Sequence, residues 1–198
     1  MRRIHALALI PFFALAACSA PAATPSPAAP ASSAATQPST PASSAPASTG
    51  KVLTGDGYTL TLPEGWKDAT DAFKKLQPQI DTGAKDGSDT KDGFNDNVNV
   101  IVQASPGIPL DQLGSTLKTQ LEGAGSTDVQ LKDNVQLDGQ EGIQVWSRTK
   151  GAGDAHTIQF VAVNAGKLYI ITVSSNSNET KAAALAQQVI SGWKWASA

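Results

Sequence analysis

A long stretch of this chain cannot contribute to a hydrophobic core. From Ser19 to Gly50 the sequence contains seven prolines, many alanine, serine and threonine residues, and no charged residue. Such a composition buries too little apolar surface to offset the entropy of ordering the chain, and it is typical of a semi-rigid spacer. Fully extended at about 3.1 Å per residue, the segment would reach up to roughly 100 Å. We therefore expect a linker up to residue 50 and a folded domain at residues 51–198.

The residues before the linker have the layout of a secretory signal peptide. Arg2 and Arg3 precede a stretch from Ile4 to Ala17 that is apolar apart from His5. A membrane-spanning helix needs about 20 apolar residues, and this run is shorter and contains Pro11. A signal peptide at residues 1–17 is therefore favoured over a permanent transmembrane helix.

The end of the apolar run predicts a lipid anchor. Leu15-Ala16-Ala17-Cys18 resembles the bacterial lipobox, in which the cysteine receives a diacylglyceryl group and becomes the first mature residue. Cys18 is the only cysteine, so no disulfide can form within the chain. Two acyl chains are enough for stable membrane attachment. We expect an extracytoplasmic protein, lipid-anchored to the cell membrane, in which residues 18–50 form the acylated cysteine and linker.

The 148 residues after the linker are a normal length for one domain with a single core. Without Arg2 and Arg3, 13 basic residues remain against 17 acidic ones, which gives a formal charge of −4. This balance argues against a basic nucleic-acid footprint and against a polybasic patch for anionic lipids. Nucleic acid is therefore not an expected partner.

Hydrophobic periodicity predicts an α/β fold with a largely antiparallel sheet packed against helices. Two strands that flank the turn signal at residues 164–167 are apolar on both faces and should lie centrally. The expected helices are Ala69–Leu76, after Asp68 as N-cap, Leu110–Glu122 and Asn178–Ser191. The expected strands are Tyr58–Leu62, Asn97–Ala104, Asp128–Leu131, Val135–Leu137, Gly142–Thr149, His156–Val163 and Leu168–Ser174.

Three short motifs resemble a known family. The strand and Pro-x-Gly-Trp segment Tyr58–Trp66 is similar to the opening of actinobacterial LpqN-type lipoproteins and of the wider PsbP-like group. Gly93–Val100 resembles their second block, and Asp138-Gly139 followed by Gly142-Ile143 resembles their third. The resemblance implies an α-β-α sandwich and a non-enzymatic role, and some LpqN-type members are linked to envelope glycolipids and MmpL lipid exporters. The motif residues look structural, so no ligand-contacting position is carried over.

The mature chain lacks a catalytic signature. Its one histidine, His156, would have to serve any Ser-His-Asp triad, and no Gly-x-Ser-x-Gly elbow is present. Ser115-Thr116-Leu117-Lys118 has the Ser-x-x-Lys form of penicillin-binding enzymes, but the accompanying Lys-Thr-Gly is missing. We predict that the protein is not an enzyme, needs no cofactor, and has His156 at a strand end.

The segment Asp81–Asp96 is rich in aspartate, which raises the question of a calcium site. Its spacing does not fit the EF-hand, because the glycine and the final glutamate are misplaced. Interleaved Lys85 and Lys91 favour a solvated flexible loop over a metal site. We expect no metal, although these residues alone leave the alternative open.

Four tryptophans are the remaining candidates for ligand contact, since indole rings are favoured where an apolar surface meets a polar rim. Trp66 and Trp193 are expected in the core, whereas Trp146 and Trp195 are candidates for contact with a ligand or partner. The leading hypothesis is a non-catalytic binding module for an envelope lipid, a glycolipid or a membrane-protein partner such as a transporter. This hypothesis includes a role in lipid transport. The alternative is a purely structural accessory subunit of a membrane complex.

Overall fold

The structure is a computed structural model and describes residues 47–88, 93–149 and 154–196. In this part of the chain, a seven-stranded sheet has the order β3-β4-β5-β9-β8-β7-β6, and a three-stranded sheet has the order β1-β2-β10. All pairings are antiparallel. The large sheet contains β3 (Trp66–Asp68), β4 (Ile80–Asp86), β5 (Asn97–Ala104), β6 (Thr127–Leu137), β7 (Gln140–Thr149), β8 (Ala155–Asn164) and β9 (Lys167–Ser175). The small sheet contains β1 (Val52–Gly55), β2 (Tyr58–Thr61) and β10 (Trp193–Trp195), and the helices are α1 (Thr70–Leu76), α2 (Leu110–Gly123) and α3 (Glu179–Ser191).

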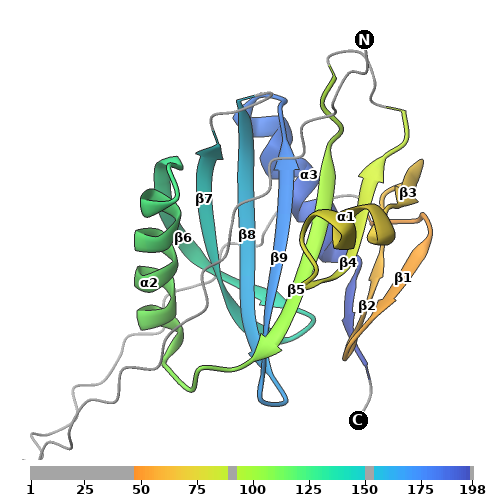
Figure 1. The fold of residues 1–198 in the computed structure, drawn as a ribbon. Helices are drawn as coiled ribbons and strands as arrows, with labels where there is room; N and C mark the ends of the chain where they lie inside the picture. Colours follow the sequence, from red (N-terminus) through yellow and green to blue (C-terminus); the bar gives the residue numbers. More distant parts are fainter. Residues whose placement is uncertain (1–46, 89–92, 150–153, 197–198) are drawn as a thin grey trace, which may run out of the picture.

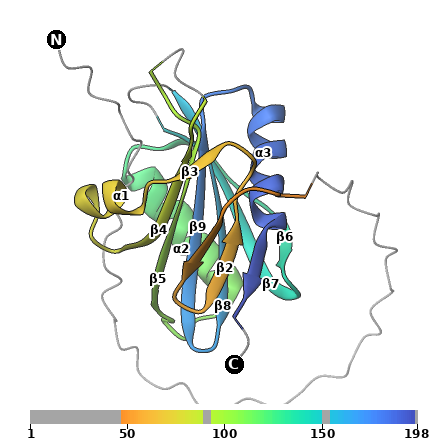
Figure 2. The ribbon, with the colours of Figure 1, turned by 90° about the vertical axis from the view of Figure 1, so that its right-hand side faces the viewer.

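The large sheet is covered on both faces, as Figures 1 and 2 show from two sides. Helix α3 and the small sheet pack on one face, where they share a hydrophobic cluster with β5, β8 and β9. Helices α1 and α2 lie on the opposite face and share a second cluster with β5, β7, β8 and β9. This arrangement confirms the predicted α/β class and the α-β-α layering.

Strand β9 shows why a strand with apolar residues on both faces lies at the centre. Tyr169 and Ile171 belong to the cluster under α3, whereas Leu168 and Ile170 belong to the cluster under α1 and α2. Alternate residues of a strand point to opposite faces, so both faces of β9 are used for packing. The central position predicted for the strands around residues 164–167 is confirmed.

The helices begin and end close to the predicted residues, although the N-cap of α1 is Ala69 and not the predicted Asp68. Leu113, Leu117 and Leu121 form the buried side of α2. Asn178 is the N-cap of α3, and its side chain accepts a hydrogen bond from the Lys181 amide. None of the described helices is long and apolar enough to cross a membrane.

Several strands differ from the expectation. Strands β1, β3 and β10 were not predicted, and β6 is one long strand with register irregularities where two short strands were expected. The prediction of a solvated loop over Asp81–Asp96 was wrong at its start, because β4 includes Asp81–Asp86. Pairing with β5 on one side and β3 on the other stabilises β4, although its polar sequence lacks a strand pattern.

Candidate binding cleft

An open cleft lies between the small sheet and α1. Its volume is about 1060 Å³, and its walls are formed by β1, the turn into α1, α1 itself and the start of β4. The lining mixes apolar, polar and charged side chains, and two of its large apolar residues are exposed to solvent. We consider this cleft the candidate functional site.

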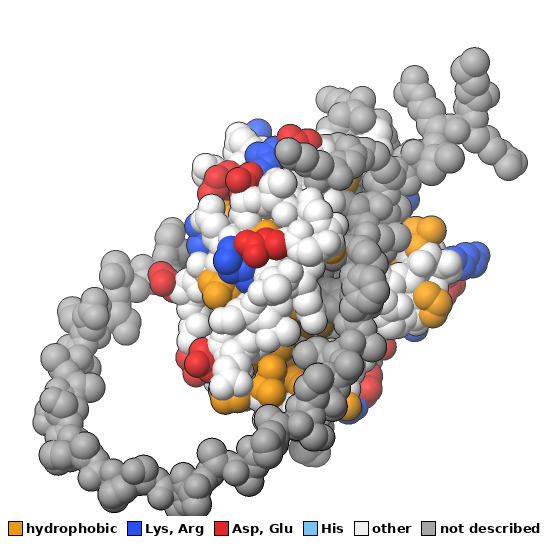
Figure 3. Space-filling model, turned by 60° about the vertical axis from the view of Figure 1, so that its left-hand side comes forward, with side chains coloured by type: hydrophobic (Ala, Val, Ile, Leu, Met, Phe, Trp, Pro, Cys, Tyr) orange, Lys and Arg blue, Asp and Glu red, His pale blue; other side chains and the backbone are white. Residues whose placement is uncertain are grey.

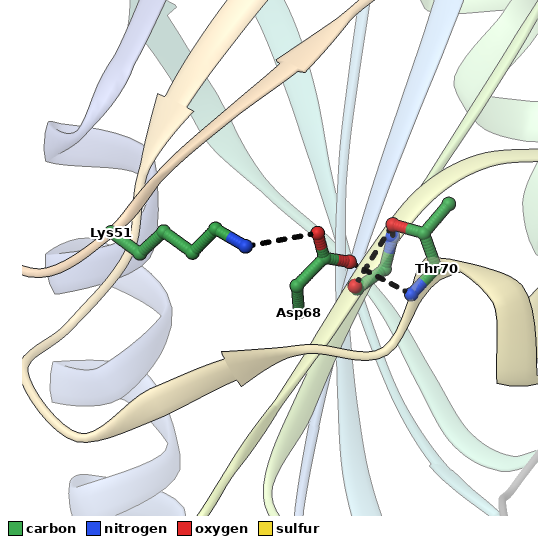
Figure 4. Close-up of polar contacts among 4 residues, drawn as sticks. Lys51, Asp68 and Thr70 are labelled. Atoms are coloured by element: carbon green, nitrogen blue, oxygen red, sulfur yellow. Dashed lines mark hydrogen bonds and ion pairs between the residues drawn. The ribbon is translucent and has the colours of Figure 1, made fainter.

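A network around Asp68 forms one end of the cleft (Figure 4). Lys51 Nζ lies 3.3 Å from Asp68 Oδ2, and Asp68 Oδ1 accepts a hydrogen bond of 3.0 Å from the Thr70 amide. The Thr70 hydroxyl oxygen accepts from the Gly83 amide at 3.1 Å, which fastens the start of α1 to β4. The bond from the Thr70 amide, followed by the Thr70 hydroxyl and Lys51, holds the pKa of Asp68 below its ordinary range. Asp68 therefore stays ionised and connects Lys51, which precedes β1, to Thr70 at the start of α1.

The other end of the cleft is closed by a tight approach of β1 to β4. The Asp56 amide donates a 2.9 Å hydrogen bond to Asp81 Oδ2, and Lys167 Nζ lies 2.6 Å from Asp56 Oδ1. A Cβ atom at Gly55 would collide with the Tyr58 ring and with the Asp81 carboxylate, so only glycine permits this approach. One carboxylate oxygen of Asp81 is thus hydrogen-bonded within the domain.

Exposed apolar and basic side chains line the cleft between these two ends. Val52 on β1 is 52% exposed and Leu76 at the end of α1 is 57% exposed, which is unusual for large apolar residues. Lys74 and Lys75 of α1 also line the cleft, and no carboxylate in the described residues forms an ion pair with either. Asp71 of α1 lines the cleft as well, and it is in no ion pair of the described residues. The cleft therefore offers apolar surface beside charges of both signs.

An aromatic cluster packs the small sheet against the large sheet. Tyr58 stacks on Trp193 with ring centroids 4.1 Å apart, and Tyr169 and Trp195 meet Trp193 edge to face at 6.0 and 5.1 Å. Tyr58 also shares a 2.6 Å hydrogen bond with Thr82 of β4, and burial raises the pKa of its phenol. The cluster fixes the small sheet, and with it β1, against the large sheet.

The two tryptophans predicted to contact a ligand lie outside this cleft and far from each other. Trp146 lies on β7, packed against the cluster under α3, with Lys132 Nζ 4.9 Å from its ring centre. Trp195 donates from Nε1 to the Leu137 carbonyl at 2.8 Å, beside the β6–β7 turn. Strand β7 begins at Gln140, next to that turn, and Trp146 lies six residues further along the strand. At about 3.3 Å per residue, this places Trp146 roughly 20 Å from the turn that Trp195 contacts. Their predicted contact with a ligand stays a prediction, whereas the predicted burial of Trp66 and Trp193 is confirmed.

The other residues considered for chemistry have structural partners. His156 is the second residue of β8, as predicted for a strand end, and its Nε2 lies 3.3 Å from Arg148 Nη1. The Ser115 hydroxyl donates to the Asp111 carbonyl, and Lys118 pairs with Glu122. Within the described ranges, no group of three His, Cys, Asp or Glu residues is placed to hold a metal ion, whereas Asp89 and Asp92 lie outside them.

A group of uncharged polar side chains occupies half of the sheet face toward α1 and α2. In register across β5, β9, β8 and β7, it comprises Asn97, Asn99, Thr172, Ser174, Thr157, Gln159 and Ser147. All are buried, and among the described residues the oxygens Gln159 Oε1, Ser147 Oγ and Ser174 Oγ have no hydrogen-bond partner. Ordered water typically satisfies such atoms, so we regard this group as an internal feature.

The surface charge is mixed. On the face seen in Figure 3, acidic and basic side chains alternate, and apolar side chains form separate groups. The predicted signal peptide, the lipobox with Cys18 and most of the linker lie outside the described residues.

The residues of the cleft were not predicted from the sequence, although one signal was available. The helix predicted at Ala69–Leu76 has apolar residues at helical spacing, which would place Leu76 on its buried side, but among the residues of α1 only Phe73 is buried. Pro78 follows soon after Leu76 and ends the helical segment. An apolar residue at such a helix end has no partner on a short helix and is a candidate contact residue.

Comparison with known proteins places this arrangement among established folds. Among models of protein families, the one for PsbP matches residues 52–194. The solution structure of cyanobacterial PsbP (CyanoP) from Synechocystis sp. PCC 6803 is similar, with a TM-score of 0.51 and 21% identity over 71% of this chain and 87% of CyanoP. LpqN of Mycobacterium tuberculosis, described as involved in cell envelope biogenesis, is similar with a TM-score of 0.50 and 12% identity, over 71% of this chain and 86% of LpqN. A comparison with curated protein sequences found no match.

Proposed function

The chain belongs to the PsbP family, and we propose that it is a non-catalytic binding module, held outside the cytoplasmic membrane by a lipid on Cys18. The anchor is supported by Leu15-Ala16-Ala17-Cys18 and by the linker that follows. A linker of this composition lets a domain stand well away from the bilayer while remaining attached to it. The domain is thus expected to meet other components of the envelope.

The cleft between β1 and α1 is the proposed contact surface. The observation that carries this assignment is the combination of exposed Val52 and Leu76 with charged side chains of α1 that are in no described ion pair, namely Asp71, Lys74 and Lys75. Binding sites are concave surfaces that combine apolar contact with a few polar groups. The arrangement provides both and lacks a nucleophile paired with a base.

The lining favours a protein partner over a carried lipid. A lipid carrier needs an enclosed apolar cavity, because acyl chains exposed to water cost about 25 cal/mol for each Å². This cleft is open and more than half of its lining residues are polar or charged. A membrane protein of the envelope, such as a transporter, is therefore the proposed partner, and carriage of an envelope lipid or glycolipid is the second candidate. The likeness to LpqN, itself described as involved in cell envelope biogenesis, supports an envelope role.

Site-specific photocrosslinking tests the proposal. A photoreactive amino acid replaces Leu76 in the cleft or, as matched control, Leu131 on β6, which is 44% exposed and is not part of the cleft. In living cells, position 76 should give a crosslinked band of protein mass, and position 131 should not. Equal crosslinking at both positions, or crosslinking only at position 131, would refute the assignment.

A lipid arm separates the two candidates. An envelope lipid extract is added to the full-length protein, and its melting temperature and tryptophan emission are compared with those of the Trp146→Phe variant. A ligand that binds only the folded state raises the melting temperature. We expect no rise; a rise together with an emission change that Trp146→Phe abolishes would favour lipid binding at the α3 face instead.

A further inference from the structure

The segment before β1 attaches the linker side of the chain to the folded domain. The Ser48 hydroxyl donates a 2.8 Å hydrogen bond to the Gln188 carbonyl of α3. Two residues further on, the Gly50 amide donates a 2.8 Å hydrogen bond to the Leu62 carbonyl, which follows β2. We call residues 47–50 the strap, because they connect the end of α3 to the end of β2.

The strap lies close to its neighbours because two glycines leave room for it. A Cβ atom at Gly50 would collide with the carbonyl oxygen of Pro63 and lie 2.8 Å from that of Leu62. A Cβ atom at Gly192, just after α3, would lie 3.1 Å from the Ser48 Cβ. Glycine permits such a close approach of one backbone to another. A side chain at Gly50 would therefore displace the strap.

The strap continues into Lys51, whose side chain reaches the end of the cleft at Asp68. The Leu62 amide donates to the Lys51 carbonyl at 2.9 Å, beside the bond from Gly50 to Leu62. Lys51 Nζ then lies 3.3 Å from Asp68 Oδ2, as Figure 4 shows. The ends of secondary-structure elements open most readily. Loss of the strap bonds would therefore expose Lys51 as the new end of the β1–β2 pair.

The contacts of the strap are weak enough to open without unfolding of the domain. A single hydrogen bond contributes little to stability. The ion pair is also weak, because the side chains of Lys51 and Asp68 are 59% and 39% exposed. The strap is the last part of the linker predicted from the sequence. A pull on the linker therefore acts on Ser48 and Gly50 before it acts on β1.

We propose that the strap is a conformational switch that couples the linker to the cleft. With the strap docked, Lys51 stays on Asp68 and blocks its carboxylate. With the strap drawn away, Lys51 withdraws and the Asp68 carboxylate becomes available within the cleft. The proposal rests on the proposed function of the cleft and adds a means of regulating it. Because coupling between two sites is reciprocal, loss of the Asp68 charge should also loosen the strap.

The pKa of Asp68, measured by NMR in the full-length protein in detergent, reports the position of Lys51. The bond from the Thr70 amide and, to a smaller extent, Lys51 hold this pKa below its ordinary value of 3.8. Ser48→Ala and Gly50→Ala should each raise the pKa part of the way toward 3.8, because Lys51 is released while the Thr70 bond remains.

Ser191→Ala is the matched control for Ser48→Ala. The Ser191 hydroxyl donates to the same Gln188 carbonyl, at 2.7 Å, but Ser191 belongs to α3 and not to the strap. The control variant should leave the pKa of Asp68 unchanged. An equal rise in both variants would contradict the proposal, because the pKa would then respond to α3 and not to the strap.

Amide hydrogen exchange at Gly50 reports the strap itself. Ser48→Ala should speed this exchange about threefold to tenfold, as expected for the loss of one hydrogen bond. Asp68→Asn removes the charge but keeps an acceptor oxygen, and it should speed the exchange about twofold through the weakened contact with Lys51. The amide of Leu60, in the middle of the small sheet, should not change. Unchanged exchange at Gly50 in either variant would refute the coupling.

A double variant tests whether the strap acts through Lys51. In a Lys51→Gln background, Ser48→Ala should no longer change the pKa of Asp68. A rise as large as in the unchanged background would overturn the proposal. Faster exchange at Gly50 with an unchanged pKa of Asp68 would overturn it as well, because the strap would then open without moving Lys51.

The outcomes separate the strap from the proposed function. Crosslinking at position 76 without a change in the pKa of Asp68 in the strap variants would refute the switch and leave the cleft as the binding surface. The expected changes at Asp68 and Gly50 without crosslinking at position 76 would support the switch and refute the proposed contact surface.

Discussion

Replacement of Trp193 tests whether the aromatic cluster holds the cleft wall in place. The side chain is 1% exposed, stacks on Tyr58 at 4.1 Å and meets Trp195 and Tyr169 at its edges. Removing a buried tryptophan to alanine typically costs about 3–5 kcal/mol. In a domain with a total stability of about 5–15 kcal/mol, a loss of about 4 kcal/mol lowers the melting temperature by roughly 8–16 °C. Trp193→Ala should therefore be severely destabilised while remaining folded at low temperature.

Trp193→Phe separates the contribution of packing from that of the indole nitrogen. Among the described residues, Trp193 Nε1 has no hydrogen-bond partner, so phenylalanine removes volume but breaks no hydrogen bond. Its cost should be only about 1–2 kcal/mol. Leu76→Ala, at an exposed position of the cleft, should stay within about 0.5 kcal/mol of the unchanged protein. Urea unfolding followed by circular dichroism measures all three, and a loss below about 1 kcal/mol for Trp193→Ala would refute the role of the cluster.

Three further predictions concern the anchor, the domain boundary and pH. Cys18→Ala should abolish incorporation of a fatty-acid probe, and undiminished labelling would contradict the lipid anchor. A fragment beginning at Lys51 should unfold in one transition but be about 1–3 kcal/mol less stable than a fragment beginning at residue 47. The shorter fragment lacks the hydrogen bonds from Ser48 to Gln188 and from Gly50 to Leu62. Equal melting temperatures of the two fragments would show that these bonds contribute nothing. Asp68→Ala should cost up to about 1 kcal/mol at pH 7. The pKa of Asp68 is lowered in the folded protein, so its contribution is present above the ordinary value of 3.8 and disappears as the pH falls through the lower folded value; melting curves of the two proteins should therefore converge in acid, and a constant difference would contradict the ion-pair account.

The elements that were predictable from the sequence are those whose own residues determine their packing. Leu113, Leu117 and Leu121 recur at helical spacing and pack on the sheet as expected. The strands β8 and β9 are apolar on both faces and lie in the middle of the sheet. For these segments, local pattern and tertiary environment agree.

The cleft was not predictable because its walls depend on contacts between distant segments. Strand β4 is polar and contains Gly83, and its extended form results from pairing with β3 and β5. Strand β1 has one buried apolar residue, Leu53, which is too little for a periodic signal. The exposure of Leu76 likewise depends on how short α1 is, and helix ends are the least predictable part of a helix.

The small sheet has a consequence for the order in which the domain forms. Its first two strands come from the beginning of the domain, whereas β10 is the last strand of the described chain and pairs with β2 through Trp193 and Leu60. An isolated two-stranded hairpin is marginally stable in water at best. Nearly the whole domain must therefore be present before β1 gains lasting support, and a chain that stops before Trp193 would not present the cleft. A partner that binds the cleft would in this way select complete molecules over incomplete ones.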